Sequence, residues 1–172
     1  MKYNQIDRIT SLVPGESITA ERTLRAGEEY LADHFPRFPV MPGVMMLEAL
    51  HQAARWLVRV TDDFAHPLVH LDGVRSVKFG DFLAPDETLV VNASIVGVTG
   101  GVYKLKASAT KDGKSTVSAR LVMRPATTGD PDRLGNDAEV IRAVREQFAK
   151  LYGAAVEGQG HDPDRVRENR LG

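Results

Sequence analysis

The 172-residue chain contains no cysteine, which excludes disulfides, thiolate metal sites and a cysteine nucleophile. It also has no excess of one charge, because 22 Lys and Arg stand against 23 Asp and Glu. A global basic field for nucleic acid or anionic membranes is therefore excluded. There is neither an apolar run of about eighteen residues nor a signal-like N-terminus. We expect a cytoplasmic protein that neither spans a membrane nor binds nucleic acid.

The residues that are present have an ordinary globular composition. Apolar residues make up 42% of the chain and charged residues 26%, so a disordered polyelectrolyte is excluded. The length fits one domain on the usual scale of about 100–200 residues. We therefore expect one domain with a substantial core.

The N-terminal region predicts a short helix followed by a strand. Apolar residues at helical spacing precede the Pro14-Gly15 turn, and these are Ile6, Ile9 and Leu12. From residue 17 to residue 24 the apolar residues fall on alternate positions, with Arg22 interrupting them. That alternation is typical of a strand with one wet face.

A proline-rich loop and then a long helix come next. The segment HFPRFPVMPG, residues 34–43, holds three prolines and must be an irregular, fixed loop. Strong helix formers with apolar residues on most faces fill residues 42–60, which predicts a largely buried helix. Glu48, His51 and Gln52 lie inside it, and burying an unpaired polar group costs roughly 2–7 kcal/mol. These three residues therefore need partners or a function.

The second half of the chain predicts an antiparallel sheet. Alternating apolar residues mark four segments, at residues 68–79, 88–98, 102–110 and 115–123. Gly100-Gly101 and Asp112-Gly113 supply two tight turns that tolerate positive φ. One buried helix with several antiparallel strands predicts an α+β fold, in which the sheet curls around the helix.

The last part of the chain predicts an additional helix. Residues 125–135 are turn-rich, and Asn136 with Glu139 resembles a capping box. An apolar face follows, and Gly153 is expected to end the helix. This helix would dock on the sheet or on a partner subunit, and the residues from 154 onwards would form a flexible tail. We therefore divide the chain into a main domain at residues 1–124 and an extension at residues 125–172.

The most specific pattern in the chain lies between residues 34 and 52. It is HFPRFPVMPGV over residues 34–44 and EALHQ over residues 48–52. This resembles the signature of the FabZ-type 3-hydroxyacyl-[acyl carrier protein] dehydratases, HFPGxPVMPGV followed by EAxxQ. A chance match at about a dozen positions is negligible. The resemblance covers roughly residues 5–124 and implies the hot-dog fold, an antiparallel sheet curled around one helix.

The resemblance implies that His34 and Glu48, fourteen positions apart, are catalytic. Eliminating water from an (R)-3-hydroxyacyl thioester needs a base for the C2 proton, an acid for the C3 hydroxyl and a donor for the thioester carbonyl. We assign the first role to His34, the second to Glu48, and the third to the Gly43 N–H at the helix start. Burial raises the pKa of a carboxyl group whereas a helix N-terminus lowers it, which leaves the direction for Glu48 open.

Four further residues are expected to bind substrate or to support the site. Phe35 and Phe38 are candidates for the mouth of an acyl tunnel, and Val40 and Gln52 support the motif around them. Arg37 stands where the family motif has glycine. Because this change adds side-chain bulk without removing a proton-transfer group, it bears on acyl chain length rather than on the reaction.

The resemblance also implies partners and leaves rival interpretations. The expected partner is acyl carrier protein, and the expected assembly is a homodimer or a trimer of dimers in which His34 and Glu48 come from different chains. Candidates for contact with the acidic carrier are basic residues, namely Arg37, Arg55, Arg59, Arg75 and Lys78. We expect no cofactor and no metal, although Glu48, His51 and His34 match a zinc ligand set in type. A hot-dog thioesterase, a double-bond isomerase and a non-catalytic acyl-binding protein are the alternatives.

Overall fold

The computed structural model describes residues 4–129 and 137–156. The described residues form six strands, a short 3-10 helix and two α-helices. In chain order they are β1 (Arg8–Val13), β2 (Ser17–Thr23), η1 (Glu29–Leu31), α1 (Gly43–Thr61), β3 (Leu68–Phe79), β4 (Thr88–Thr99), β5 (Val102–Lys111), β6 (Lys114–Ala126) and α2 (Asp137–Val156). The long helix and the later strands lie where the sequence predicts them.

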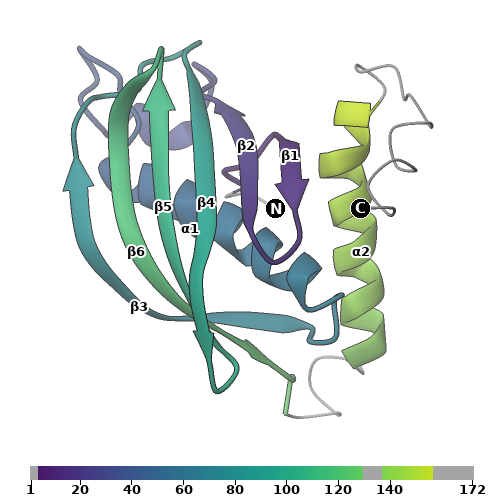
Figure 1. Ribbon diagram of the computed structural model, residues 1–172. Helices are drawn as coiled ribbons and strands as arrows, with labels where there is room; N and C mark the ends of the chain where they lie inside the picture. The colour runs from purple at the N-terminus through teal and green to yellow at the C-terminus, as the bar shows by residue number, and fades with distance from the viewer. Residues whose placement is uncertain (1–3, 130–136, 157–172) are drawn as a thin grey trace, which may run out of the picture.

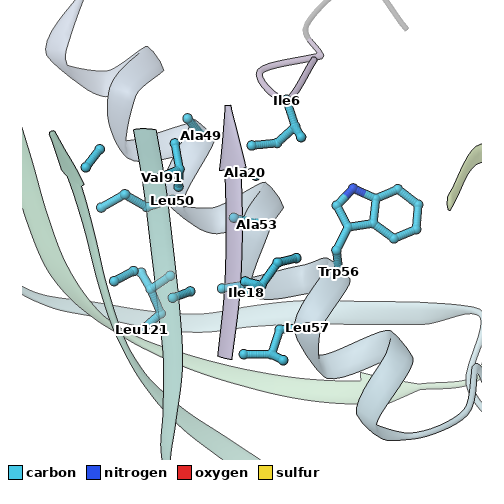
Figure 2. Close-up of a cluster of buried hydrophobic side chains, with 14 of the residues drawn as sticks. Ile6, Ile18, Ala20, Ala49, Leu50, Ala53, Trp56, Leu57, Val91 and Leu121 are labelled. Carbon is cyan, nitrogen blue, oxygen red and sulfur yellow. The ribbon is translucent and has the colours of Figure 1, made fainter. Parts of the chain in front are cut away.

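The six strands form one antiparallel sheet in the order β1-β2-β4-β5-β6-β3. The sheet curls around α1, which lies along its concave face (Figure 1). The predicted α+β architecture is therefore confirmed. Small residues on the inner face of β5, such as Ala107 and Ala109, are fully covered and leave room for the helix. Figure 2 shows Leu50, Ala53 and Leu57 of α1 beside Ile18 of β2 in this core.

The predicted N-terminal helix is wrong, because this segment is strand β1. The register between β1 and β2 shifts between Ile9 and Ser11, so one extra residue is inserted at Thr10. Residues on the same face of a strand are normally two positions apart, and the extra residue makes this spacing three. Ile9 and Leu12 therefore both face inward, Ile9 opposite Ala20 and Leu12 opposite Ile18. A β-bulge produced the spacing that resembles a helix.

The additional helix α2 lies alongside β1, on the side of α1 that the sheet does not wrap (Figure 1). The ring of Phe148 on α2 lies tilted against that of Trp56, with centroids 5.9 Å apart, and packs edge-on against Phe64. The helix continues through Gly153 to Val156, so the predicted end at Gly153 is wrong. An isolated glycine weakens a helix by about 1 kcal/mol but does not stop it.

Some of the predictions lie outside the described residues. They are most of the turn-rich linker, the Asn136 cap and the tail beyond residue 156. Within the described part, no helix is long and apolar enough to cross a membrane.

Candidate active site

A compact loop between η1 and α1 carries His34. The backbone N–H of His34 donates to the carbonyl of Tyr30 at 3.0 Å, which ties the residue to the end of η1. Phe35 has a φ of +54°, and its carbonyl accepts a hydrogen bond from the Phe38 N–H at 2.8 Å. Positive φ is rare for an aromatic residue and persists only where the surrounding structure enforces it. The proline-rich segment is therefore the fixed turn that the sequence predicts.

The side chain of His34 is held in one tautomer. Its Nδ1 lies 2.9 Å from the carbonyl oxygen of Val40, a residue with no exposed surface. A carbonyl oxygen only accepts hydrogen bonds, so Nδ1 carries the hydrogen and donates it. In the neutral ring Nε2 then keeps its lone pair, and it has no hydrogen-bond partner among the described residues. The lone pair on Nε2 of His34 is therefore available to accept a proton.

The start of α1 offers free backbone donors beside an exposed ring. No backbone carbonyl of the described chain accepts from the Gly43 N–H, as expected for the first turn of a helix. A Cβ on Gly43 would lie 2.9 Å from the ring of Phe79 at the end of β3. Only glycine fits here without moving that ring, so the N–H remains open to an incoming oxygen.

Glu48 lies on α1 about one and a half turns from Gly43 and receives two side-chain hydrogen bonds. Gln52 Nε2 donates to one carboxylate oxygen at 2.8 Å, and His51 Nδ1 lies 3.0 Å from the other. Burial alone would raise the pKa of Glu48, but these hydrogen bonds and the positive charges of His51 and Arg55 outweigh it. The pKa of Glu48 is therefore lowered, and its resting form is the carboxylate.

The sequence marks His51 as a polar residue that needs a partner or a function and as a metal ligand in type, and the structure pairs it with Glu48. Its Nε2 is buried and has no hydrogen-bond partner among the described residues. Within the part of the chain described, no three His, Asp or Glu side chains are grouped to hold a metal ion. The printed side-chain hydrogen bonds of the two predicted catalytic residues go to other partners: His34 to Val40, and Glu48 to His51 and Gln52.

Large apolar side chains are exposed around these groups. Phe38 is 63% exposed and Phe35 is 59% exposed, and the Phe38 ring meets that of Phe82 edge-on at 6.3 Å. Phe79 and Val44 are also open to solvent. The sequence pointed to Phe35 and Phe38, but Phe79 and Phe82 come from β3 and the segment after it, and only the fold brings them here.

Of the five basic residues proposed to contact the carrier protein, Arg59 is buried and Arg55 is partly buried. Arg59 is buried, its guanidinium lies 5.0 Å from the centre of the Trp56 ring, and it donates to the Pro67 carbonyl. Burial, aided by the charge of Arg55, lowers the pKa of Arg59 to about 10. Arg55 is partly buried, and its Nε has no partner in the described residues. The prediction is wrong for Arg59, because the end of α1 is enclosed.

Comparison with known proteins identifies the family. The profile of the FabA-like domain matches residues 1–120. The chain belongs to the FabA-like family. It is 38% identical over 117 residues to a 3-hydroxyacyl-[acyl-carrier-protein] dehydratase FabZ of Oenococcus oeni, covering 68% of this chain and 84% of that one. The FabZ protein of Ruminiclostridium cellulolyticum is 37% identical to this FabA-like chain over 109 residues, covering 63% and 77% of the two chains.

Solved structures support the fold of this FabA-like protein. A chain of the ApeI:P dehydratase heterocomplex from Xenorhabdus doucetiae matches with a TM-score of 0.62 at 15% identity, over 77% of this chain and 90% of that one. A hypothetical thioesterase with coenzyme A from Streptococcus pneumoniae matches with a TM-score of 0.57 at 11% identity, over 70% and 85%. At such low identity the likeness shows the hot-dog fold alone.

Proposed function

We propose that the chain is a FabZ-type dehydratase, which converts (R)-3-hydroxyacyl chains on acyl carrier protein to trans-2-enoyl chains in fatty-acid or related lipid biosynthesis. Its relatives support the reaction class, because they are 3-hydroxyacyl-[acyl-carrier-protein] dehydratases. The observation that carries the assignment is the Nδ1 hydrogen bond of His34 to Val40, which leaves Nε2 as the base.

In the dehydration direction His34 Nε2 takes the C2 proton. The thioester carbonyl oxygen then gains negative charge and accepts the Gly43 N–H, aided by the positive end of the α1 dipole. The C3–O bond breaks, and the departing hydroxyl takes a proton from Glu48 and leaves as water. A proton must pass back from His34 to Glu48 before the next turnover. The residues supply all the proton transfers by themselves, so the reaction needs no cofactor.

The lowered pKa of Glu48 favours one of the two resting forms. A carboxylate with a protonated His34 is ready for hydration, because Glu48 accepts a proton from the attacking water and His34 gives one to C2. A protonated Glu48 with a neutral His34 is ready for dehydration. The lowered pKa of Glu48 keeps it in the carboxylate form that hydration uses, so the reverse reaction is a suitable assay.

The complete site is proposed to form between two copies of the chain. The resemblance to the FabZ-type dehydratases implies that His34 of one chain and Glu48 of another share a site. Strand β3 is twelve residues long and lies at the edge of the sheet formed by the described residues, where β6 is its neighbour. Leu71, Val77 and Phe79 are exposed along it. An unpaired edge with apolar side chains suits a second copy of the same strand, which gives a homodimer, and trimers of such dimers remain part of the proposal.

The carrier protein would approach the exposed end of the site. Arg37, Arg75 and Lys78 are exposed near the loop or along β3, and they supply positive charge for an acidic carrier. Acyl carrier protein substrates and the lack of cysteine both fit a cytoplasmic location. The exposed rings of Phe35 and Phe38 are the surfaces proposed to contact the acyl chain.

The deciding experiment follows the enone absorbance of a short trans-2-enoyl thioester with wild type and with His34→Ala. We expect consumption by wild type alone, with a 3-hydroxyacyl product and no free thiol. Release of free thiol would instead indicate a thioesterase. Equal rates in the two proteins, or no reaction with either acyl carrier protein or pantetheine thioesters, would contradict the assignment.

A further inference from the structure

Arg22 of β2 is a charged residue on the inner face of the sheet. Its side chain is only 3% exposed, and it follows Ile18 and Ala20 in the inward alternation of the strand. Five donors on a guanidinium are costly to bury unless each finds an acceptor. Arg22 has several: its Nη1 donates to the Thr23 carbonyl at 2.9 Å and lies 3.4 Å from Asp7 Oδ1. The guanidinium is therefore fixed in orientation.

One branch of hydrogen bonds leads from Arg22 to Glu48. Arg22 Nε donates to the side-chain oxygen of Gln5 at 3.1 Å, and the backbone N–H of Gln5 donates to Gln52 Oε1 at 2.8 Å. Gln52 Nε2 in turn donates to Glu48 Oε1 at 2.8 Å. Gln5 and Gln52 are both buried. The carboxylate of Glu48 is thus aligned through two buried amides that Arg22 holds in place.

A second branch leads from Arg22 to the turn that carries His34. Arg22 Nη2 forms an ion pair with Glu28, and the Tyr30 hydroxyl donates to the other oxygen of Glu28 at 2.6 Å. The backbone carbonyl of Tyr30 accepts the N–H of His34 at 3.0 Å. The chain of contacts that fixes η1 therefore ends at the backbone of the proposed base.

We propose that Arg22 is a positioning residue that holds both proton-transfer groups of a chain, Glu48 through Gln5 and Gln52, and His34 through Glu28 and Tyr30. The proposal rests on the proposed function, and it adds a residue that lies outside the HFPRFPVMPGV and EALHQ segments. In the proposed dimer each chain gives His34 to one site and Glu48 to the other. One arginine would then serve two active sites.

Mixing variants tests the two branches separately. In the dimer, His34→Ala and Glu48→Gln should restore about a quarter of wild-type hydration when mixed one to one, because half of the dimers are mixed and each has one intact site. Glu28→Ala should behave like His34→Ala, so hydration should be restored when it is mixed with Glu48→Gln but not when it is mixed with His34→Ala. Gln52→Leu should behave like Glu48→Gln, so only His34→Ala rescues it. Arg22→Gln should be rescued by neither partner.

The kinetics of Arg22→Gln give a second measure. We expect kcat per folded dimer to fall about tenfold or more with KM within twofold, because small displacements of proton-transfer groups cost catalysis more than binding. Arg8→Gln is the matched control, since Arg8 pairs with Glu21 on the neighbouring strand at the surface. It should keep wild-type rates. A wild-type kcat for Arg22→Gln, or rescue of it by either partner, would overturn the proposal.

Two measurements keep the test open if Arg22→Gln does not fold. Arg22→Lys retains the positive charge but lacks the planar guanidinium with its several donors. The mixing experiments with Glu28→Ala and with Gln52→Leu can each be done without any change at Arg22. Carbethoxylation of His34, followed by mass spectrometry with exposed His70 as the internal reference, does not depend on dehydratase activity. We expect His34 in Arg22→Lys to react at least about twofold faster than in wild type. Unchanged reactivity would contradict the branch to His34, whereas an inactive wild type would contradict only the proposed function.

Discussion

Trp56 and Val44 lie on the same helix, yet Trp56 is 1% exposed and Val44 is 68% exposed. The C-terminal half of α1 is enclosed within the chain, because α2 brings Phe148 onto Trp56 and Arg59 turns its guanidinium inward. The N-terminal half ends among exposed phenylalanine rings and free backbone donors. One half of the helix is covered by its own chain, whereas the other is exposed where we propose that a second chain and the substrate bind.

This difference separates the two roles that a buried helix can have. Substitutions in the enclosed half should change the free energy of unfolding, and substitutions in the open half should change catalysis. Four variants along α1 test whether the two halves differ in this way.

The largest effect is expected from Glu48→Gln. Loss of a general acid or base typically costs 10²–10⁴-fold in rate, and we expect hydration to fall by about that factor. The thermal unfolding curve should stay within experimental error of wild type, because the amide retains the shape of the side chain. Glu146→Gln on the exposed face of α2 is the control for loss of a carboxylate. A hydration rate near that of wild type would remove Glu48 from the mechanism.

Trp56→Ala should lower the free energy of unfolding by about 3–5 kcal/mol, the usual cost of removing a fully buried indole. Phe148 would lose its ring contact with Trp56 at the same time and keep those with Phe64 and Tyr152. Denaturant unfolding monitored by far-UV circular dichroism measures the change. Val44→Ala on the same helix should shift it by less than about 0.5 kcal/mol, as for exposed positions. Similar losses in both variants would show that the two halves of α1 are equally enclosed.

Gly43→Ala should reduce hydration by about tenfold, because its methyl group must displace the Phe79 ring that lies 2.9 Å from the new Cβ. Alanine is a good helix former, so the unfolding temperature should not fall. If the displaced ring is the cause, adding Phe79→Ala should recover part of the rate. Failure of the double variant to recover would place the defect at the Gly43 N–H itself.

The smallest effect is expected from His51→Leu. His51 lowers the pKa of Glu48 by hydrogen bonding and charge, so its removal raises that pKa. Hydration requires the carboxylate, and the acid limb of its pH profile should therefore move to higher pH. His66→Leu is the control, because it removes a similar histidine–carboxylate pair with Asp62, beyond the other end of α1. It should leave the acid limb of the pH profile unchanged. A limb that moves to lower pH would contradict the role given to His51.

Sequence reasoning succeeded where local patterns carry the information. The long helix, the later strands and the apolar face of α2 all follow from periodicity, and the family follows from one motif. It failed at β1 because a bulge imitates helical spacing, and at Gly153 because packing against the core outweighs the cost of one glycine. Both failures reflect tertiary contacts that a short window of sequence does not contain.

The candidate site shows the same limit. His34, Glu48 and Gly43 were identified from the motif, but Phe79 and the Arg22 network were not, because they come from distant segments. Arg22 had left one signal, an arginine at an inward position of an alternating strand. The sequence could not say that its charge is satisfied by Gln5 and Glu28.

The pairing of β3 has a consequence for the order in which the protein is made. Strand β3 emerges before β4 and β5, but its hydrogen-bonded neighbour is β6, the last strand of the sheet. Long-range pairing of this kind is slow, because loop closure must precede the contacts that reward it. The strand edge proposed to meet a second chain is thus completed only after the β4–β6 meander has formed. Until β6 has been synthesised, β3 lacks this neighbour, and an unpaired strand is most prone to pair with another chain at that stage.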